Sequence, residues 1–184
     1  IYGVSFEPEY GVVIDNFSFR GTSGIELGKL DDMVLNEVSK SGTYDLIVLQ
    51  YGVNLMFRQN DMNYDYYYRR MTPLVKHLKE RLKGSDLMVV SCTDRAFRYS
   101  EGWQTAKGLE SLLAVQAKIA RDNDTAFFNL FKTMGGKGTI VKWASAEYKL
   151  AAKDYIHASH KGAAILGKHL FDAFMLDYKK LENK

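Results

Sequence analysis

Short apolar runs alternate with longer amphipathic segments along most of the chain. Four runs rich in Val, Ile, Leu and Phe have the length of buried parallel strands: residues 11–17, 44–50, 86–92 and 125–130. Three segments are too long for strands and repeat apolar residues every three or four positions: residues 24–40, 65–83 and 105–123. Strands and helices in this alternation predict βαβ units, a parallel sheet and helices on both of its faces.

Two further segments frame this pattern. Residues 160–178 predict a last helix, with an apolar stripe that would close the fold: Ala164, Leu166, Leu170, Phe171, Phe174 and Met175. Residues 1–9 predict one more strand that ends at a Pro turn. Because no helix follows this strand, we interpret residues 1–10 as a re-entry strand from a preceding module. Residues 11–184 then form one domain.

The composition is that of a folded, soluble protein. A net charge of +3, with Lys and Arg scattered among the acids, argues against a nucleic acid or a polybasic membrane contact as partner. No run of about 18 apolar residues predicts a membrane span. The single cysteine, Cys92, leaves the redox compartment open. The sequence begins at Ile1 without a leader pattern, so we interpret it as part of a longer polypeptide.

Candidate chemistry follows the predicted strands. In an open parallel sheet, ligands bind at the carboxyl ends of the strands. Gly21 follows the first run, and Asn54 follows the second in Gly-Val-Asn. Asp154 and His157 lie three residues apart just before the last helix, where a carboxylate can orient an imidazole that removes a proton from a hydroxyl. Taken singly, each has a simpler interpretation, as a turn glycine, a turn asparagine or a surface polar pair.

The order of these motifs resembles the SGNH (GDSL-type) hydrolases. The resemblance implies a three-layer α/β/α doubly wound parallel sheet, similar to that of flavodoxin. It also implies that Gly21 and Asn54 are oxyanion donors, and that Asp154 and His157 are the acid and base of a catalytic triad. Arg20 stands where the family usually has a small residue and would shape the pocket.

The Gly-Asp-Ser motif of the family does not occur in this sequence. Ser23 in Gly-Thr-Ser-Gly fails the Gly-x-Ser-x-Gly pattern and lies where the glycine block belongs. In the family's strand order, 2-1-3-4-5, the serine follows strand 1, whereas the four runs resemble strands 2 to 5. We therefore expect strand 1 and the serine in an upstream segment of the same polypeptide. Members similar to peptidoglycan O-acetylesterases carry an inserted carbohydrate-binding module there, and residues 1–21 resemble the return from it.

The resemblance predicts a serine esterase that hydrolyses O-acyl esters, most simply O-acetyl esters, on a carbohydrate outside the cytoplasm. Residues 1–184 alone are expected to be inactive. No cofactor is implied, and no Cys or carboxylate cluster at ligand spacing predicts a metal. Loops at the expected site supply candidates for substrate contact: Arg20, Arg58, Arg95 and Trp103. A non-catalytic carbohydrate-binding or scaffold protein and an acyltransferase remain alternatives, and the sequence does not identify the acyl group or the sugar.

Overall fold

The computed structural model describes residues 10–41 and 44–182. Its main sheet has three parallel strands in the order β1-β2-β5. The strands are β1 (Leu46–Gln50), β2 (Asp86–Val90) and β5 (Ala126–Phe128). Val48 pairs with Met88, and Val90 pairs with Phe128. Three of the four predicted strands are therefore confirmed, each shorter than its apolar run.

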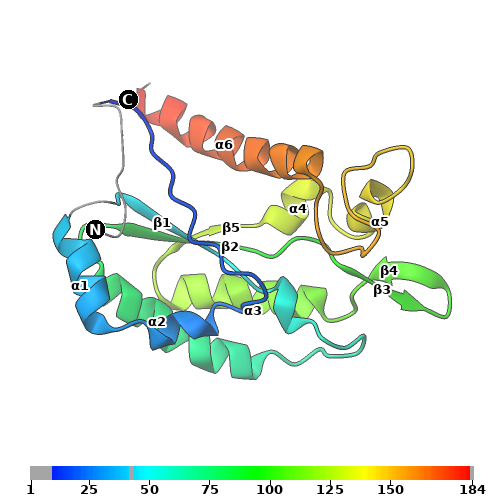
Figure 1. Cartoon of the computed structure of the whole chain (residues 1–184), viewed down its shortest axis with the longest axis horizontal. Helices are drawn as coiled ribbons and strands as arrows, with labels where there is room; N and C mark the ends of the chain where they lie inside the picture. Colours follow the sequence, from blue (N-terminus) through cyan, green and yellow to red (C-terminus); the bar gives the residue numbers. More distant parts are fainter. Residues whose placement is uncertain (1–9, 42–43, 183–184) are drawn as a thin grey trace.

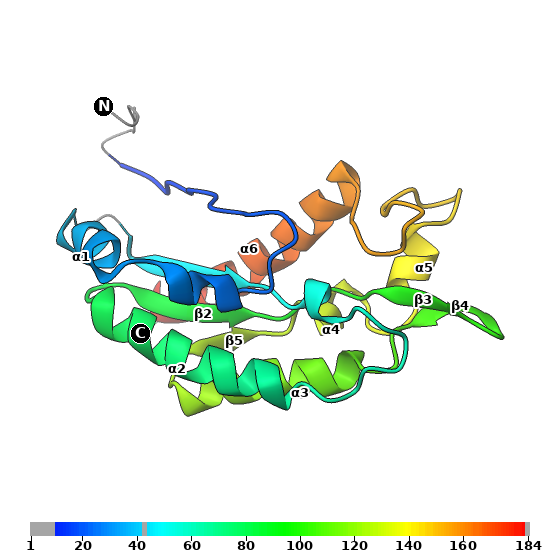
Figure 2. The same ribbon diagram turned by 60° about the horizontal axis from the view of Figure 1, so that its bottom comes forward.

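The helices give the sheet its second and third layers. They are α1 (Asp32–Ser41), α2 (Asp65–Arg81), α3 (Leu109–Asp122), α4 (Leu130–Met134), α5 (Thr139–Trp143) and α6 (His160–Glu182). Helices α2 and α3 lie side by side on one side of the sheet, and α6 lies on the opposite side next to α4 (Figures 1 and 2). The predicted α/β/α class with a parallel sheet is confirmed.

The main core lies between the sheet and the layer formed by α2 and α3. Val75 on α2 and Leu109 and Leu112 on α3 are completely buried. The apolar residues of each helix recur at helical spacing and form a stripe on the face that meets the sheet. Burial of these two stripes holds α2 and α3 against the sheet. On the other side of the sheet, a smaller cluster around Ile140 and Trp143 joins α5 to the start of α6.

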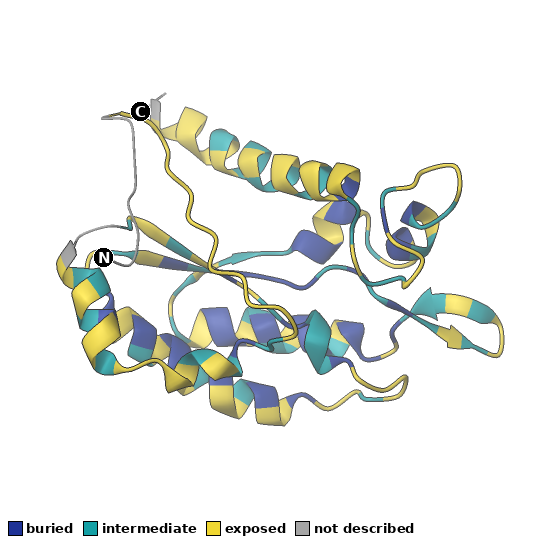
Figure 3. Cartoon of the chain, in the orientation of Figure 1, coloured by how far each residue is buried: buried dark blue, intermediate teal, exposed yellow. Residues whose placement is uncertain are grey.

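The predicted strand at residues 11–17 is wrong for this structure. The segment carries no strand and is an extended, exposed stretch (Figure 3). Val12, for example, is 88% exposed. A strand needs a neighbour that accepts and donates its backbone hydrogen bonds. In the described part of the chain β1 pairs with β2 alone, so residues 11–17 have no ladder partner. The predicted strand over residues 1–9 lies outside the described residues.

Two helix predictions also need correction. The segment 24–40 is divided into a 3₁₀ helix, η1 (Ile25–Lys29), and α1, because Asp31 starts a new helix by accepting a hydrogen bond from Met33 N–H at 2.8 Å. The last helix does not close the fold among the described residues. Phe171 is 60% exposed on α6, and Phe174 is also exposed.

Residues 93–103, expected to be a loop, lie mostly in a β-hairpin that ends at Thr105. Strands β3 (Ala96–Tyr99) and β4 (Gly102–Thr105) pair antiparallel, with Gly102 at a φ of 105° after the turn. The hairpin projects beyond the carboxyl end of β2, at the end of the sheet where ligands bind in this architecture (Figure 1). Its place makes it a neighbour of the candidate site.

Candidate functional site

The predicted acid and base are in contact. Asp154 Oδ2 lies 2.7 Å from His157 Nδ1. The other carboxylate oxygen, Oδ1, accepts hydrogen bonds from the backbone N–H of Ile156 at 2.9 Å and of His157 at 3.1 Å. Asp154 therefore holds both the backbone and the ring of His157, which favours the tautomer with the proton on Nδ1.

The acid–base loop, which we define as residues 151–159, closes on itself before α6 begins. Ala151 and Ala158 form an antiparallel bridge, and Ala152 N–H donates to His157 O at 2.8 Å. Ser159 caps α6 by accepting a hydrogen bond from Gly162 N–H at 3.2 Å. Tyr155 takes a left-handed conformation, with φ 57°. The loop is thus ordered by its own hydrogen bonds and anchored on the first turn of α6.

Electrostatics keep Asp154 ionised. Burial raises the pKa of this carboxyl. Hydrogen bonds from the His157 ring and from two backbone N–H groups together lower the pKa by more, so that it lies below its usual range. The charged form is the one that stabilises an imidazolium. The side chain of His157 is 61% exposed, and its Nε2 makes no hydrogen bond within the described residues. This nitrogen is therefore accessible to a hydroxyl from elsewhere.

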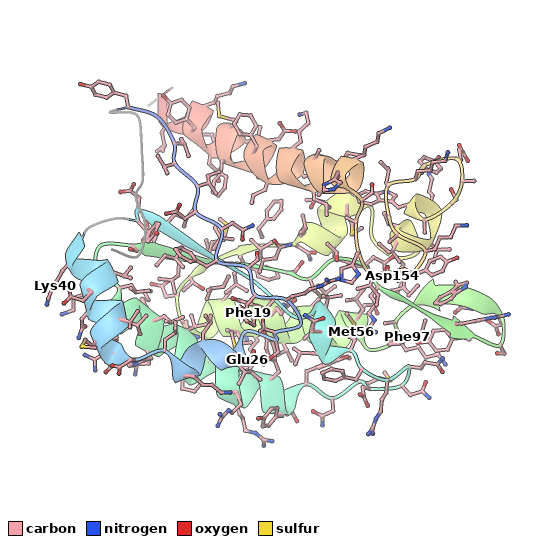
Figure 4. All side chains as sticks on the ribbon, in the orientation of Figure 1. Phe19, Glu26, Lys40, Met56, Phe97 and Asp154 are labelled. Atoms are coloured by element: carbon pink, nitrogen blue, oxygen red, sulfur yellow. The ribbon has the colours of Figure 1, made fainter. Side chains whose placement is uncertain are left out.

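The other two motif residues are brought together at the end of β1. Asn54 lies in the 3₁₀ turn η2 (Val53–Leu55), and its Nδ2 donates to Thr22 O at 2.8 Å, next to Gly21. Gly21 has a φ of 78°, which disfavours any side chain there. The glycine block and the Gly-x-Asn block are thus in direct contact through this hydrogen bond. Asp154, labelled in Figure 4, lies at the same end of the molecule as η2.

The Ser23 side chain is held by Glu26. Its hydroxyl lies 3.0 and 3.2 Å from the two carboxylate oxygens of Glu26, in a local turn at the start of η1. The thiol of Cys92 is buried, and this burial raises its pKa to about 12. Neither group is hydrogen-bonded to His157 in the described residues, and the sequence pattern had already argued against Ser23 as the nucleophile.

The four candidates for substrate contact occupy different settings. Arg20 and Arg58 are exposed in turns. Arg95 points inward, donates from Nη1 to Val53 O at 3.0 Å, and places its guanidinium 4.6 Å from the centre of the Phe97 ring. Burial lowers the pKa of Arg95, and the charge of Asp154 opposes this. Arg95 thus bonds the carbonyl that precedes Asn54 and also feels the charge of Asp154, the predicted acid.

Trp103 packs against the acid–base loop. Its ring stacks on that of Tyr155 with centroids 4.0 Å apart and planes at 24°. Ala96 N–H also donates to Tyr155 O at 3.0 Å. The hairpin therefore contacts the acid–base loop through Trp103 and Ala96. Arg95, just before the hairpin, contacts the Asn54 turn by its hydrogen bond to Val53 O. Sequence reasoning did not single out Tyr155, although its place inside Asp-x-x-His marks it as a neighbour of both catalytic candidates.

Gln116 is a second residue that sequence reasoning missed. It is almost completely buried on α3 and accepts a hydrogen bond from Cys92 N–H at 3.1 Å while donating to Tyr51 O at 2.7 Å. The side chain thereby ties the ends of β1 and β2 together below η2. A polar residue within the apolar stripe of α3 was the available signal.

Substituting Gly162 by alanine should destabilise the acid–base loop. An added Cβ would lie 2.0 Å from Leu150 O, the carbonyl that accepts from Ser159 N–H. We expect a loss of about 3 kcal/mol in the free energy of unfolding, measured by urea denaturation. Gly167→Ala is the matched control on the same helix, because nothing lies within 4 Å of its Cβ. The control should gain about 0.5–1 kcal/mol, and equal effects at the two sites would contradict the geometry.

Among the described residues, no group of three or more His, Cys, Asp and Glu side chains is placed to hold a metal ion. None of the helices in the described ranges has the length and apolarity needed to cross a membrane.

No family model matches the sequence, and no curated protein matches it. Solved structures do. One, described as "Peptidoglycan O-acetylesterase in action", superposes with a TM-score of 0.75 at 21% identity over 87% of this chain and 45% of that chain. A GDSL-like lipase structure from Parabacteroides merdae gives 0.50 at 20% identity over 70% and 59% of the two chains.

A protein from Lactobacillus plantarum gives a TM-score of 0.55 at 15% identity, over 74% of this chain and 68% of that one. The chain spans less than half the length of the peptidoglycan O-acetylesterase structure. At these identities the likeness concerns the fold, and it bears out at that level the resemblance that the motifs indicated. This chain therefore has the α/β fold of solved proteins that include a peptidoglycan O-acetylesterase and a GDSL-like lipase.

Proposed function

We propose that this chain is the acid–base and oxyanion part of a serine esterase that removes O-acyl groups, most simply O-acetyl groups, from a carbohydrate. The observation that carries the proposal is the Asp154–His157 pair, joined at 2.7 Å with Nε2 of the histidine open to a further partner. The fold shared with a solved peptidoglycan O-acetylesterase supports the substrate class and a location outside the cytoplasm.

The proposed chemistry assigns one step to each group. A serine hydroxyl attacks the acyl carbon while His157 Nε2 takes its proton and Asp154 stabilises the imidazolium. Gly21 N–H and the Asn54 amide hold the negative charge of the tetrahedral intermediate. His157 then returns the proton to the departing sugar oxygen, and water hydrolyses the acyl-serine by the same route in reverse.

The serine is proposed to come from an upstream segment of the same polypeptide, on a strand beside β1. Leu46 and Val48 on β1 are exposed, and the strand has no second ladder partner in the described ranges. Residues 15–22 run alongside β1 in the same direction: Tyr44 donates to Asp15 at 2.7 Å before the strand, and Asn54 donates to Thr22 after it. A strand inserted between the two would pair with β1 and cover this exposed surface.

Two alternatives use the same fold. Because no hydroxyl is bonded to His157 Nε2 within the described residues, a non-catalytic carbohydrate-binding protein would have the same geometry. An acyltransferase would use the same groups, with an acceptor hydroxyl in place of water.

The test compares two proteins on p-nitrophenyl acetate and on acetylated glycans. Residues 1–184 alone should release no acid above background, and the longer polypeptide, with its upstream segment, should turn over many times. Inertness of the longer polypeptide on both substrates would favour the non-catalytic alternative. Activity of residues 1–184 alone would refute the upstream serine.

Arg95→Lys should impair turnover in the longer polypeptide more than binding. Lysine keeps the charge but loses the planar group that lies over Phe97 and bonds Val53 O, so the Asn54 turn is held less firmly. We expect kcat to fall about tenfold with KM little changed, because the Asn54 turn acts on the transition state. Arg98→Lys, three residues further along on β3, is the control, since Arg98 is exposed. A rise in KM alone would instead make Arg95 a substrate-binding residue.

A further inference from the structure

A wide groove lies beside the acid–base loop, outside the groups assigned to catalysis. It has a volume of about 1020 Å³. One wall is formed by β4 and the residues after it, including Trp103 and Lys107, and the other by α5 and the loop after it, including Lys142 and Tyr148. Trp103 belongs to both sites, because it lines the groove and stacks on Tyr155 of the acid–base loop. A polymer whose ester group lies beside His157 would thus continue into the groove.

The lining suits a sugar chain. Trp103 is 39% exposed and Tyr148 is also exposed, so aromatic surface is available to the C–H faces of pyranose rings. Gln104 on β4 adds a polar side chain to the same groove. Ser145 Oγ, in the wall, is buried and has no hydrogen-bond partner among the described residues. Buried polar groups are normally hydrogen-bonded, so a ligand in the groove could supply the partner that this hydroxyl lacks after a change of rotamer.

The charges of the groove favour an anionic ligand. Lys107, Lys137 and Lys142 line it, against one carboxylate, Glu147. Lys137 is paired with Glu110 at 2.8 Å, but Lys107 and Lys142 lie over aromatic rings, 4.9 Å from the centre of Tyr99 and 4.8 Å from that of Tyr148. Both lysines are exposed, and neither forms an ion pair with a carboxylate of the described residues. Each can therefore pair with a carboxylate of a ligand without breaking an existing ion pair.

The two walls are tied together from below. Asp94, completely buried, accepts hydrogen bonds from Thr105 Oγ1 at 2.8 Å and from Ile140 N–H at 3.0 Å. Gly138 N–H donates to the same Thr105 hydroxyl at 2.8 Å. Since Thr105 ends β4 and Ile140 belongs to α5, the spacing of the groove is set before a ligand arrives. A preformed site loses less free energy on ordering when it binds.

We propose that this groove is a glycan subsite that binds the sugar units next to the esterified one and selects chains that carry carboxylate groups. Trp103 and Tyr148 contact the sugar rings, and Lys107 and Lys142 pair with the carboxylates. The inference rests on the proposed esterase function only in taking the bound sugar chain to be the substrate. Binding of the sugar chain itself requires no turnover.

The test is calorimetric titration of residues 1–184 with two tetrasaccharides of the same length. One is chitotetraose, which is neutral, and the other alternates N-acetylglucosamine with N-acetylmuramic acid, which adds carboxylates to a similar backbone. We expect the acidic chain to bind at least about fivefold more tightly at low salt and to lose this advantage as the salt concentration rises.

A double variant, Lys107→Gln with Lys142→Gln, should lower affinity for the acidic chain about fivefold and leave affinity for chitotetraose unchanged. The matched control, Lys168→Gln with Lys180→Gln, removes two exposed lysines of α6 and should change neither affinity. Equal affinity for the two chains, equal effects of the two double variants, or no binding at millimolar ligand would each overturn the proposal. Failure of the esterase assay with these binding results intact would refute the proposed function and leave the subsite standing.

Discussion

Replacing His157 by alanine in the longer polypeptide is expected to lower kcat/KM for p-nitrophenyl acetate by about 10⁴-fold. Without the imidazole, no group is placed to take the proton of the attacking hydroxyl, and the oxyanion donors alone sustain a small residual rate. The measurement is p-nitrophenol release at saturating and limiting substrate. Folding is checked by urea denaturation, which should change little because the histidine side chain is 61% exposed.

Asp154→Asn should have a comparable effect for a different reason. An amide in place of the carboxylate no longer stabilises the imidazolium and favours the wrong tautomer at the 2.7 Å contact. His160→Ala is the matched control, since this exposed histidine lies three residues further along, in the first turn of α6. If His157→Ala keeps more than a tenth of the activity, or if His160→Ala loses as much, the assignment of the base fails.

Strong periodicity made the layers of the fold predictable. The runs at 44–50, 86–92 and 125–130 became strands because continuous Val, Leu and Phe residues suit a buried sheet. Helices α2, α3 and α6 were predictable from a different pattern, in which apolar residues recur every three or four positions. These signals are local, so one sequence is enough to read them.

Pairing and tertiary contacts were not predictable in the same way. Residues 11–17 have the composition of a strand, but a strand forms only beside a partner, and none is present in the described ranges. The hairpin at 96–105 was missed because its alternation of Phe97, Tyr99 and Trp103 was interpreted as an active-site loop. The glycine between the two apolar stretches, Gly102, was the available turn signal in the sequence, and the structure gives it a positive φ.

The site divides along the same line. The Asp154–His157 contact could be predicted because three residues of separation bring the two side chains within reach of each other. The inward direction of Arg95 could not, since its partner Val53 lies 42 residues away and is a backbone carbonyl. The roles of Gly21 and Asn54 stay predictions, and the adjacency of their blocks through Thr22 is what makes them testable.

Asn54→Ala in the longer polypeptide is expected to lower kcat by about 10²- to 10³-fold with little change in KM. In this structure Nδ2 donates one hydrogen bond to Thr22 O at 2.8 Å, and the amide has a second N–H that remains for an oxyanion. Because the charge on that oxygen develops only in the transition state, the loss should appear in kcat.

Two comparisons make the Asn54 result specific. Asn36→Ala on α1 removes an asparagine far from η2 in sequence and should leave kcat unchanged. Asn54→Asp should be at least as harmful as alanine, because a carboxylate has no N–H to donate and would repel the Thr22 carbonyl. A change confined to KM would place Asn54 in ground-state binding. If His157→Ala abolishes activity while Asn54→Ala does not, the acid–base pair is functional and the oxyanion is held by other donors, so the two halves of the motif resemblance would be separated by experiment.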